Sequence, residues 1–184
     1  MKKILLIILF ISVGFSQHLT EVIETYENGN IKSITSHKET RNRIEKVKYV
    51  EYYDNGQKMY DGKYKEGNKE GLWTQWHENG QKDEEGPYKD GKRDGLWRGW
   101  HKNGQNAAEV TMKNGERVGS ETRWHKNGQK ALEGTRKDGK KEGKYTVWNP
   151  NGQKEEEGTY KDGELNGLVT GWHENGQKRY EINY

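Results

Sequence analysis

Four histidines stand at one position of a repeated motif, so they are the first candidates for metal or proton chemistry. They are His77, His101, His125 and His173. A zinc site needs its nitrogen ligands within about 2.1 Å of one metal ion. If the histidines belong to separate repeat units, the copies lie about 10 Å apart, point the same way and do not converge. We therefore predict no metal site and no cofactor, and we expect these rings to pack and hydrogen-bond locally beside turns.

Acidic and basic residues also recur, which raises the question of enzymatic chemistry. The acids are Asp61, Glu85, Glu109, Glu133 and Glu157, and the lysines are Lys58, Lys82, Lys130, Lys154 and Lys178. A glycosidase needs one pair of carboxyl groups in unlike environments, whereas here the same acid returns in unit after unit. Nucleophiles are scarce, because the chain has no cysteine and its serines after residue 16 are Ser33, Ser36 and Ser120. We predict that the protein is not an enzyme and that the charges form solvated ladders along a sheet.

A row of tryptophans is the best candidate for a binding surface. Its members are Trp76, Trp100, Trp124, Trp148 and Trp172. Exposed rings could contact a partner protein or stack on the sugar rings of a polysaccharide. The alternative is that the rings form core, because the chain is only 28% hydrophobic and needs its aromatic residues. Residues 106–121 have lost glycine, tyrosine and tryptophan from the pattern, which we attribute to drift in preference to a specialised contact patch.

These side chains must be positioned by a strict repeat of 24 residues. Asn-Gly pairs recur at this step, at Asn55-Gly56, Asn79-Gly80, Asn103-Gly104, Asn127-Gly128, Asn151-Gly152 and Asn175-Gly176. A second glycine turn lies inside each unit, at Glu66-Gly67, Asp90-Gly91, Asn114-Gly115, Asp138-Gly139 and Asp162-Gly163. Such pairs favour two-residue hairpin turns, in which both central residues have positive φ. We predict an all-β fold, an elongated antiparallel β-meander of 24-residue hairpin repeats in a single layer, twisted and curled.

The register across these turns places large rings opposite glycines. Pairing around Asn79-Gly80 sets Trp73 opposite Gly86 and Gly71 opposite Tyr88. A ring can lie flat over bare backbone, so we interpret these glycines as packing seats. Pairing around Asp90-Gly91 sets Gly86 opposite Gly95, and the seat opposite Trp97 is lost at Val110. The structural set is Gly62, Gly71, Trp73, Gly86, Tyr88, Gly95 and Trp97, together with the Asn-Gly pairs. Trp76 then points to the other side of the sheet from Trp73, unless a bulge intervenes.

The N-terminus has the layout of a secretory signal peptide. Lys2 and Lys3 precede an apolar run over residues 4–13 that is too short to span a bilayer, and we expect cleavage before Gln17. The absence of cysteine excludes a lipid anchor on cysteine and any disulfide. We predict a signal peptide at 1–16, a divergent N-terminal β unit at 17–51 and the repeat array at 52–184. The protein should be exported, to the periplasm, the outer surface or the medium.

The repeats resemble a known family. GKYKEGNKEGLW at 62–73 and GPYKDGKRDGLW at 86–97 are similar to MORN repeats, and more closely to the bacterial variant found in YwqK-like proteins. The resemblance covers about residues 22–184 and implies an elongated β-meander that serves as a scaffold for protein or membrane-lipid contacts. It brings no catalytic residues. Some YwqK-like members are described as antitoxins, which neutralise a toxin by binding it.

The function expected from the sequence is that of a non-enzymatic exported scaffold. WHENGQK, at 76–82 and again at 172–178, is interpreted as the end of one strand, a turn and the start of the next. The scaffold is expected to bind a partner protein through the tryptophan row. The alternatives are a carbohydrate-binding surface protein and a YwqK-like antitoxin. Without Lys2 and Lys3 the net charge falls from +3 to +1, which gives no general attraction to nucleic acid. Open sheet edges could also pair two copies into a homodimer.

Overall fold

A computed structural model describes residues 4–5, 11–12, 18–40 and 42–184. All regular elements in these ranges are β-strands, and the ranges include no helix long and apolar enough to cross a membrane. The predicted signal peptide lies outside the described residues, apart from β1 (Ile4–Leu5) and β2 (Ile11–Ser12), which pair with β3 (His18–Thr25).

The chain divides into two compact units, residues 1–92 and 93–184. The strands of the first continue with β4 (Ile31–Thr40), β5 (Arg43–Tyr52), β6 (Lys58–Lys65), β7 (Asn68–Trp76) and β8 (Lys82–Lys89). Strand β9 (Lys92–Arg93) falls at the division. The second unit has β10 (Gly95–Trp100), β11 (Asn106–Lys113), β12 (Glu116–Trp124), β13 (Lys130–Lys137), β14 (Lys140–Trp148), β15 (Lys154–Lys161), β16 (Glu164–Leu165), β17 (Leu168–Trp172) and β18 (Lys178–Asn183).

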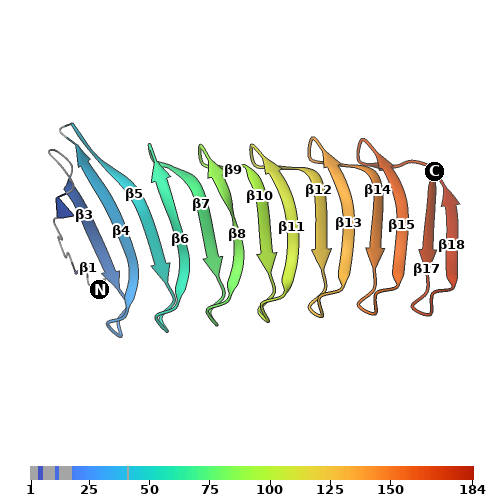
Figure 1. Ribbon diagram of the computed structural model, residues 1–184, viewed down its shortest axis with the longest axis horizontal. Helices are drawn as coiled ribbons and strands as arrows, with labels where there is room; N and C mark the ends of the chain where they lie inside the picture. The colour runs from blue at the N-terminus through green and yellow to red at the C-terminus, as the bar shows by residue number, and fades with distance from the viewer. Residues whose placement is uncertain (1–3, 6–10, 13–17, 41) are drawn as a thin grey trace. The chain divides into compact units, whose positions relative to one another are not determined.

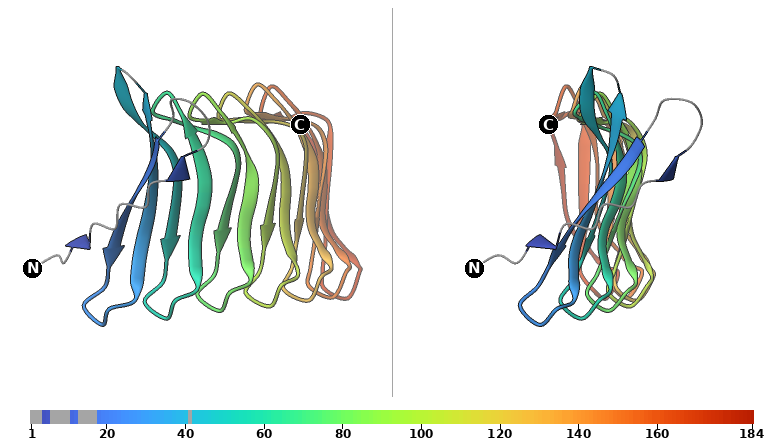
Figure 2. Two further views of the ribbon diagram at one scale, coloured as in Figure 1. Left: turned by 60° about the vertical axis from the view of Figure 1, so that its left-hand side comes forward. Right: turned by 90° about the vertical axis from the view of Figure 1, so that its left-hand side faces the viewer.

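Within each unit the strands form a twisted antiparallel meander in a single layer (Figures 1 and 2). From β3 to β8 each strand pairs antiparallel with the next. From β10 to β15 the same holds, and β15 then pairs with both β16 and β17, and β17 with β18. The predicted all-β meander of hairpin repeats is confirmed.

The turns inside the repeat units have the predicted two-residue geometry. Asp138 has φ 50° and Gly139 has φ 77°, and the other four pairs of this kind likewise have two positive φ values. An Asp or Asn side chain tolerates the left-handed region better than most, and glycine adopts it without steric cost. Two adjacent residues with positive φ match the right-handed twist of the flanking strands.

The Asn-Gly turns are different, and the prediction of a two-residue turn is wrong there. Only the glycine has positive φ, 82° at Gly80, whereas Asn79 does not. The Gly80 N–H donates to the His77 carbonyl at 2.9 Å, and the His77 N–H donates to the Gln81 carbonyl at 2.8 Å, which closes a three-residue loop. The Asn79 side chain accepts a hydrogen bond from the Gln81 N–H at 3.1 Å. This bond holds asparagine in the ordinary region and leaves the left-handed position to glycine alone.

The register predicted around Asn79-Gly80 is confirmed, since Trp73 pairs with Gly86 and Gly71 with Tyr88. The closest seat, however, is Gly62 on the preceding strand. An added Cβ there would lie 2.2 Å from the Trp73 ring. Gly71 is not a seat, because a Cβ at this residue would meet nothing within 4 Å.

The physical role of Gly71 lies in its backbone. Its φ is 69°, and the pairing of β6 with β7 shifts register beside it, between Gly62 and Lys63. Gly71 is therefore the left-handed residue of a β-bulge. Gly95, with φ 113°, occupies the equivalent place one repeat later. The predicted pairing of Gly86 with Gly95 joins residues of different units and stays a prediction, whereas Trp97 does pair with Val110.

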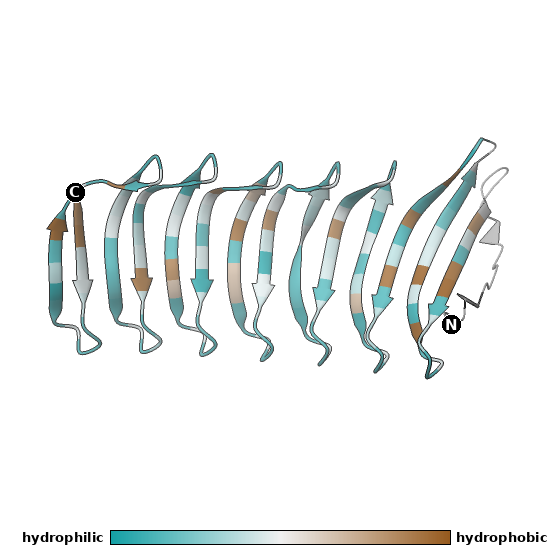
Figure 3. Ribbon diagram, turned by 180° about the vertical axis from the view of Figure 1, so that it is seen from behind, coloured by the Kyte–Doolittle hydropathy of each residue, from teal (hydrophilic) through white to brown (hydrophobic). Residues whose placement is uncertain are grey.

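The buried rings share one repeat position on one side of the sheet, which we call the core face. Trp73 is 4% exposed and Tyr145 3%. Neighbouring rings meet edge to face, with centroids 5.2 Å apart both for Tyr64 and Trp73 and for Tyr145 and Tyr160. Lys69 covers the Trp73 ring at 4.0 Å. Hydrophobic residues are confined to short bands along the strands, and the turns are hydrophilic (Figure 3). Each ring is thus covered by bare backbone, a second ring and a cation.

Replacing a seat glycine with alanine should destabilise the unit in proportion to what lies on the seat. Gly62→Ala pushes a methyl group into the Trp73 ring and should lower the free energy of unfolding by about 1–3 kcal/mol. Gly158→Ala occupies the same repeat position, but its Cβ would lie 3.0 Å from a Val169 methyl group, so the loss should be smaller. Urea unfolding of the full chain measures both. Equal losses would show that the ring does not sit on Gly62 as described.

Candidate binding surface

The tryptophan row lies on the side of the sheet opposite the core face, which we call the open face. In β14, Tyr145 is buried on the core face, whereas Trp148 lines a groove on the other side together with Thr146. The pairing of β14 with β15 shifts register at Trp148, which pairs with Lys154 and passes over Glu155. The extra residue belongs to β15, so alternation along β14 is undisturbed.

Lysines lie over three rings of the row, and all five tryptophans are partly buried. The ammonium groups of Lys58, Lys130 and Lys154 lie 5.6, 5.9 and 5.7 Å from the ring centroids of Trp76, Trp148 and Trp172. Each of these lysines also pairs with the acid three residues later, as Lys130 does with Glu133 at 2.9 Å. The row therefore packs within the sheet and presents part of each ring outward, in line with both readings of the sequence.

A groove of about 500 Å³ opens on this face of the second unit, across β12 to β15. It is lined by four hydroxyl groups, two carboxylates, two ammonium groups and one indole. The residues are Ser120, Thr122, Thr135, Thr146, Glu133, Glu157, Lys144, Lys154 and Trp148, with Gly134. An aromatic ring surrounded by polar groups can hold a ligand that is apolar on one side and forms hydrogen bonds on the other.

Glu157 is the most firmly held charge in the groove. It bonds to Lys154 at 2.5 Å and to Lys144 at 2.9 Å, and the Thr146 hydroxyl donates to it at 3.3 Å. The hydrogen bond from Lys154 lowers the pKa of Glu157 below its ordinary value, and Lys144 adds to this. Both outweigh partial burial, which raises the pKa.

The groove forms where polar side chains replace leucine on the open face. Leu72, Leu96 and Leu168 stand at one repeat position and are 59%, 39% and 52% exposed. The same position carries Ser120 in β12 and Lys144 in β14, and both line the groove. The open face of the second unit thus has exposed leucines in β10 and β17 and a polar groove between those strands.

Two of the histidines, His101 and His125, join neighbouring repeat units. The Nε2 atoms of His101 and His125 lie 2.8 and 2.7 Å from the backbone carbonyls of Trp124 and Trp148, one repeat further on. Within the described ranges, no three His, Cys, Asp or Glu side chains gather as a metal site would require. Local bonding of the rings is what the sequence predicted.

Side-chain hydrogen bonds also join neighbouring Asn-Gly turns, which the sequence did not predict. Asn103 and Asn127 donate to the carbonyls of Lys126 and Pro150 in the next turn, at 2.7 and 2.6 Å. A Cβ added to Gly152 would lie 2.7 Å from the Gln129 side chain of the preceding turn. Strict recurrence of Asn, Gly and Gln together was the available signal, because contacts between copies require the same residues in each copy.

Sequence reasoning also missed Glu121, the most deeply buried charged side chain among the residues that the structure describes. It is 2% exposed and occupies the core-face position that carries Trp73, Trp97 and Tyr145 in other repeats. The signal in the sequence is the loss of glycine, tyrosine and tryptophan over residues 106–121, which the sequence by itself does not distinguish from drift.

Hairpins of 24 residues, joined turn to turn, define a β-hairpin repeat protein. The family model described as MORN repeat variant matches residues 69–90, 93–114, 141–162 and 165–184. The chain is a MORN repeat protein. A search of curated proteins finds no matching relative. The narrower resemblance to YwqK-like proteins stays a prediction.

The Glu157 cluster should make the stability of the second unit depend on acid pH. Because the pKa of Glu157 is lowered in the folded state, its contribution is complete above the unfolded pKa and is lost as the pH falls below about 4. Glu157→Gln should therefore flatten the loss of stability at acid pH. Unfolding midpoints across the acid range measure this.

Glu133→Gln is the matched control, because its carboxylate is 52% exposed and pairs with Lys130 alone among the ion pairs described. Its acid profile should stay close to that of the wild type. Identical profiles for Glu157→Gln and the wild type would contradict the assignment.

Proposed function

We propose that the protein is a non-enzymatic scaffold that binds a partner protein through its open face. The observation that carries this proposal is the recurrence of exposed leucines, at Leu72, Leu96 and Leu168, on the face that also bears the tryptophan row. An isolated exposed leucine needs no explanation, but the same repeat position carries leucine beside half-buried indole rings in both units, and such apolar side chains suit protein contact in each unit.

The repetitive character of the polar groups supports a binding role over catalysis. An acid bonded to a lysine three residues earlier recurs in both units, as Lys58 with Asp61 and Lys154 with Glu157. Catalytic acids and bases need distinct environments. These pairs serve the sheet, and the MORN family is typically a non-enzymatic repeat scaffold.

A second candidate ligand is a polysaccharide, and the groove favours it. Trp148 can stack on a sugar ring, while Thr122, Thr135 and Thr146 can exchange hydrogen bonds with its hydroxyl groups. Membrane lipid is a further alternative, drawn from the family resemblance alone. A YwqK-like antitoxin would be a special case of protein binding, in which the partner is a toxin.

Removing the exposed leucines should abolish partner capture without unfolding the chain. Tagged protein lacking residues 1–16 would be incubated with envelope extract, beside the triple variant Leu72→Ser, Leu96→Ser, Leu168→Ser. We expect a stoichiometric protein partner with the wild type and at least about tenfold less with the variant. Ile44→Ser with Ile182→Ser is the control, since these side chains are 68% and 45% exposed outside the leucine position.

Light scattering of each variant checks its mass and also reports an edge-to-edge homodimer. Equal capture by the wild type and the leucine variant would overturn the protein-binding proposal. Recovery of polysaccharide alone, lost on Trp148→Ala, would favour the second candidate.

We also propose that the protein is exported after cleavage before Gln17. Lys2 and Lys3 followed by a short apolar run support this. Mass spectrometry of the protein from its source should find Gln17 at the N-terminus. A mature chain that retains Met1 would contradict export by this route.

A further inference from the structure

A buried carboxylate replaces the core ring in the middle of the second unit. In the other copies, the repeat position of Glu121 is occupied by neutral residues, namely Trp73, Trp97, Tyr145 and Val169. Val110, which pairs with Glu121, stands where other repeats have the seat glycine. The missing seat explains why no ring is present, but it does not call for a charge, because an aliphatic side chain would also fit.

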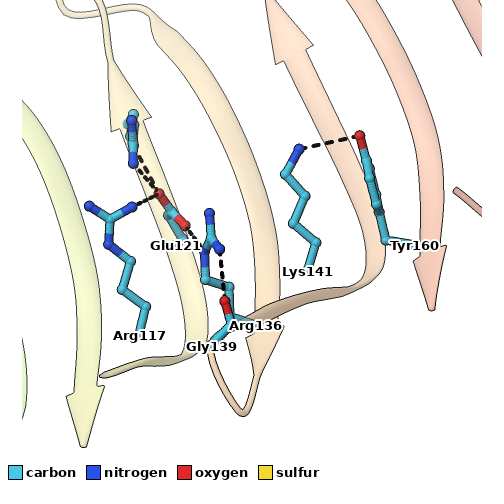
Figure 4. A network of polar contacts seen from close by, with 7 residues as sticks. Arg117, Glu121, Arg136, Gly139, Lys141 and Tyr160 are labelled. Atoms are coloured by element: carbon cyan, nitrogen blue, oxygen red, sulfur yellow. Dashed lines mark hydrogen bonds and ion pairs between the residues drawn. The ribbon is translucent and has the colours of Figure 1, made fainter. Parts of the chain in front are cut away.

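Three arginines surround Glu121 (Figure 4). Arg123 donates to Oε1 from Nη2 at 2.6 Å and from Nε at 2.9 Å, and Arg117 donates to the same atom at 3.3 Å. Arg136 donates to Oε2 from Nε at 2.6 Å and to the Gly139 carbonyl at 3.0 Å. We call Arg117, Glu121, Arg123 and Arg136 the arginine cluster.

Most of the cluster is peculiar to this repeat. The repeat position of Arg136 is neutral in the other copies, which have Tyr64, Tyr88, Met112 and Tyr160. The repeat position of Arg123 is also neutral in the other copies, which have Gln75, Gly99, Val147 and Gly171. Other repeats also have a cation at the repeat position of Arg117, where Lys69 and Lys141 each lie over an aromatic ring. The segments that match the family model leave out residues 115–140, which hold the whole cluster. Three neutral positions have therefore become charged together.

The cluster is a poor substitute for aromatic packing if stability were its purpose. Burial by itself raises the pKa of Glu121, but hydrogen bonds from Arg136 and Arg123 outweigh it and keep the carboxylate ionised. Exchanging such a buried ion group for packed apolar residues is often neutral or stabilising. The charges also do not balance, because three guanidinium groups face one carboxylate.

The surplus positive charge is accessible. The side chains of Arg117 and Arg123 are 45% and 43% exposed, whereas Glu121 is buried. Lys141 pairs with Arg136 across β13 and β14 and adds another cation, bonded to the Tyr160 hydroxyl at 3.2 Å (Figure 4). Guanidinium groups fixed by one carboxylate are preorganised to receive another.

A buried donor stands beside these cations. The Tyr145 hydroxyl has no hydrogen-bond partner among the described residues, and Tyr145 is 3% exposed. Its ring lies over Gly134, which pairs with Glu121. Burial raises the pKa of this hydroxyl, so it keeps its proton and can donate. An unpaired buried hydroxyl is costly unless something accepts its hydrogen bond.

We propose that the arginine cluster on the core face of β12 to β14 binds a carboxylate from an acidic segment of a partner protein. Arg117 and Arg123 form the outer contacts, Glu121 and Arg136 hold them in place, and the Tyr145 hydroxyl donates at the inner edge. The four cluster residues do not line the groove of the open face, and a surface site suits an extended segment better than a small free anion. Within the second unit, the site stands on the opposite face from Leu96 and Leu168, and it does not depend on the partner contact proposed for those residues.

A labelled hexaglutamate peptide tests the site on the full chain, by fluorescence anisotropy at low and physiological salt. We expect saturable, salt-sensitive binding that weakens at least about tenfold in Arg117→Gln with Arg123→Gln. Arg136 still pairs with Glu121 in this variant, so the fold should persist. Lys126→Gln with Lys161→Gln removes the same charge from exposed residues and should change the affinity less than about twofold.

A second variant separates binding from a structural role. Val110→Gly, Glu121→Tyr, Arg123→Val and Arg136→Tyr copy the next repeat and should unfold at the wild-type urea midpoint or above it, yet lose the peptide. The proposal is overturned if the wild type does not bind, if this folded variant binds equally, or if the lysine control weakens binding as much. Displacement of the peptide by inorganic phosphate at matched ionic strength, but not by acetate, would also overturn it in favour of a phosphate site.

Discussion

A sheet in one layer has no second layer against which to bury its large side chains, and the rest of each unit follows from this constraint. Burial must come from neighbouring strands. Trp73 therefore lies on the bare backbone of Gly62, meets Tyr64 edge to face and is covered by Lys69. Because each ring depends on the adjacent strands, a repeat contributes little alone and gains its stability from the next copy.

The turns also depend on neighbouring repeats, in this case through hydrogen bonds. Asn103 donates to the carbonyl of Lys126, and His101 bonds to that of Trp124, so this turn is held by the next one. This explains why a polar heptad recurs so strictly in a chain with few aliphatic residues. Differences between repeats on the open face, such as Lys144 in place of leucine, can then shape a groove without disturbing the fold.

The arginine cluster distinguishes one repeat from the others in an otherwise uniform array. A repeated surface offers every ligand several equivalent positions, whereas a single altered repeat offers one. Glu121 replaces a ring, removes the aromatic stack at that point and gathers three guanidinium groups that no other repeat assembles. In the second unit, Leu96 and Leu168 would thus supply an apolar contact on one face, and the cluster a single charged contact on the other.

The hairpin of each repeat, its turn positions and the antiparallel order followed from the sequence by itself, because a 24-residue period and glycine turns act through local backbone chemistry. The pairing of Trp73 with Gly86 followed in the same way. The tertiary structure decided what depends on neighbours. Asn79 avoids positive φ because its side chain bonds to Gln81, Gly71 serves a bulge and seats no ring, and Glu121 is buried because arginines from two strands converge on it. The bulge at Gly71 and the bond from Arg136 to Glu121 involve a neighbouring strand, and a pattern read along one strand does not contain them. The bond between Asn79 and Gln81 is local, but it belongs to a three-residue loop that the Asn-Gly pair by itself does not specify.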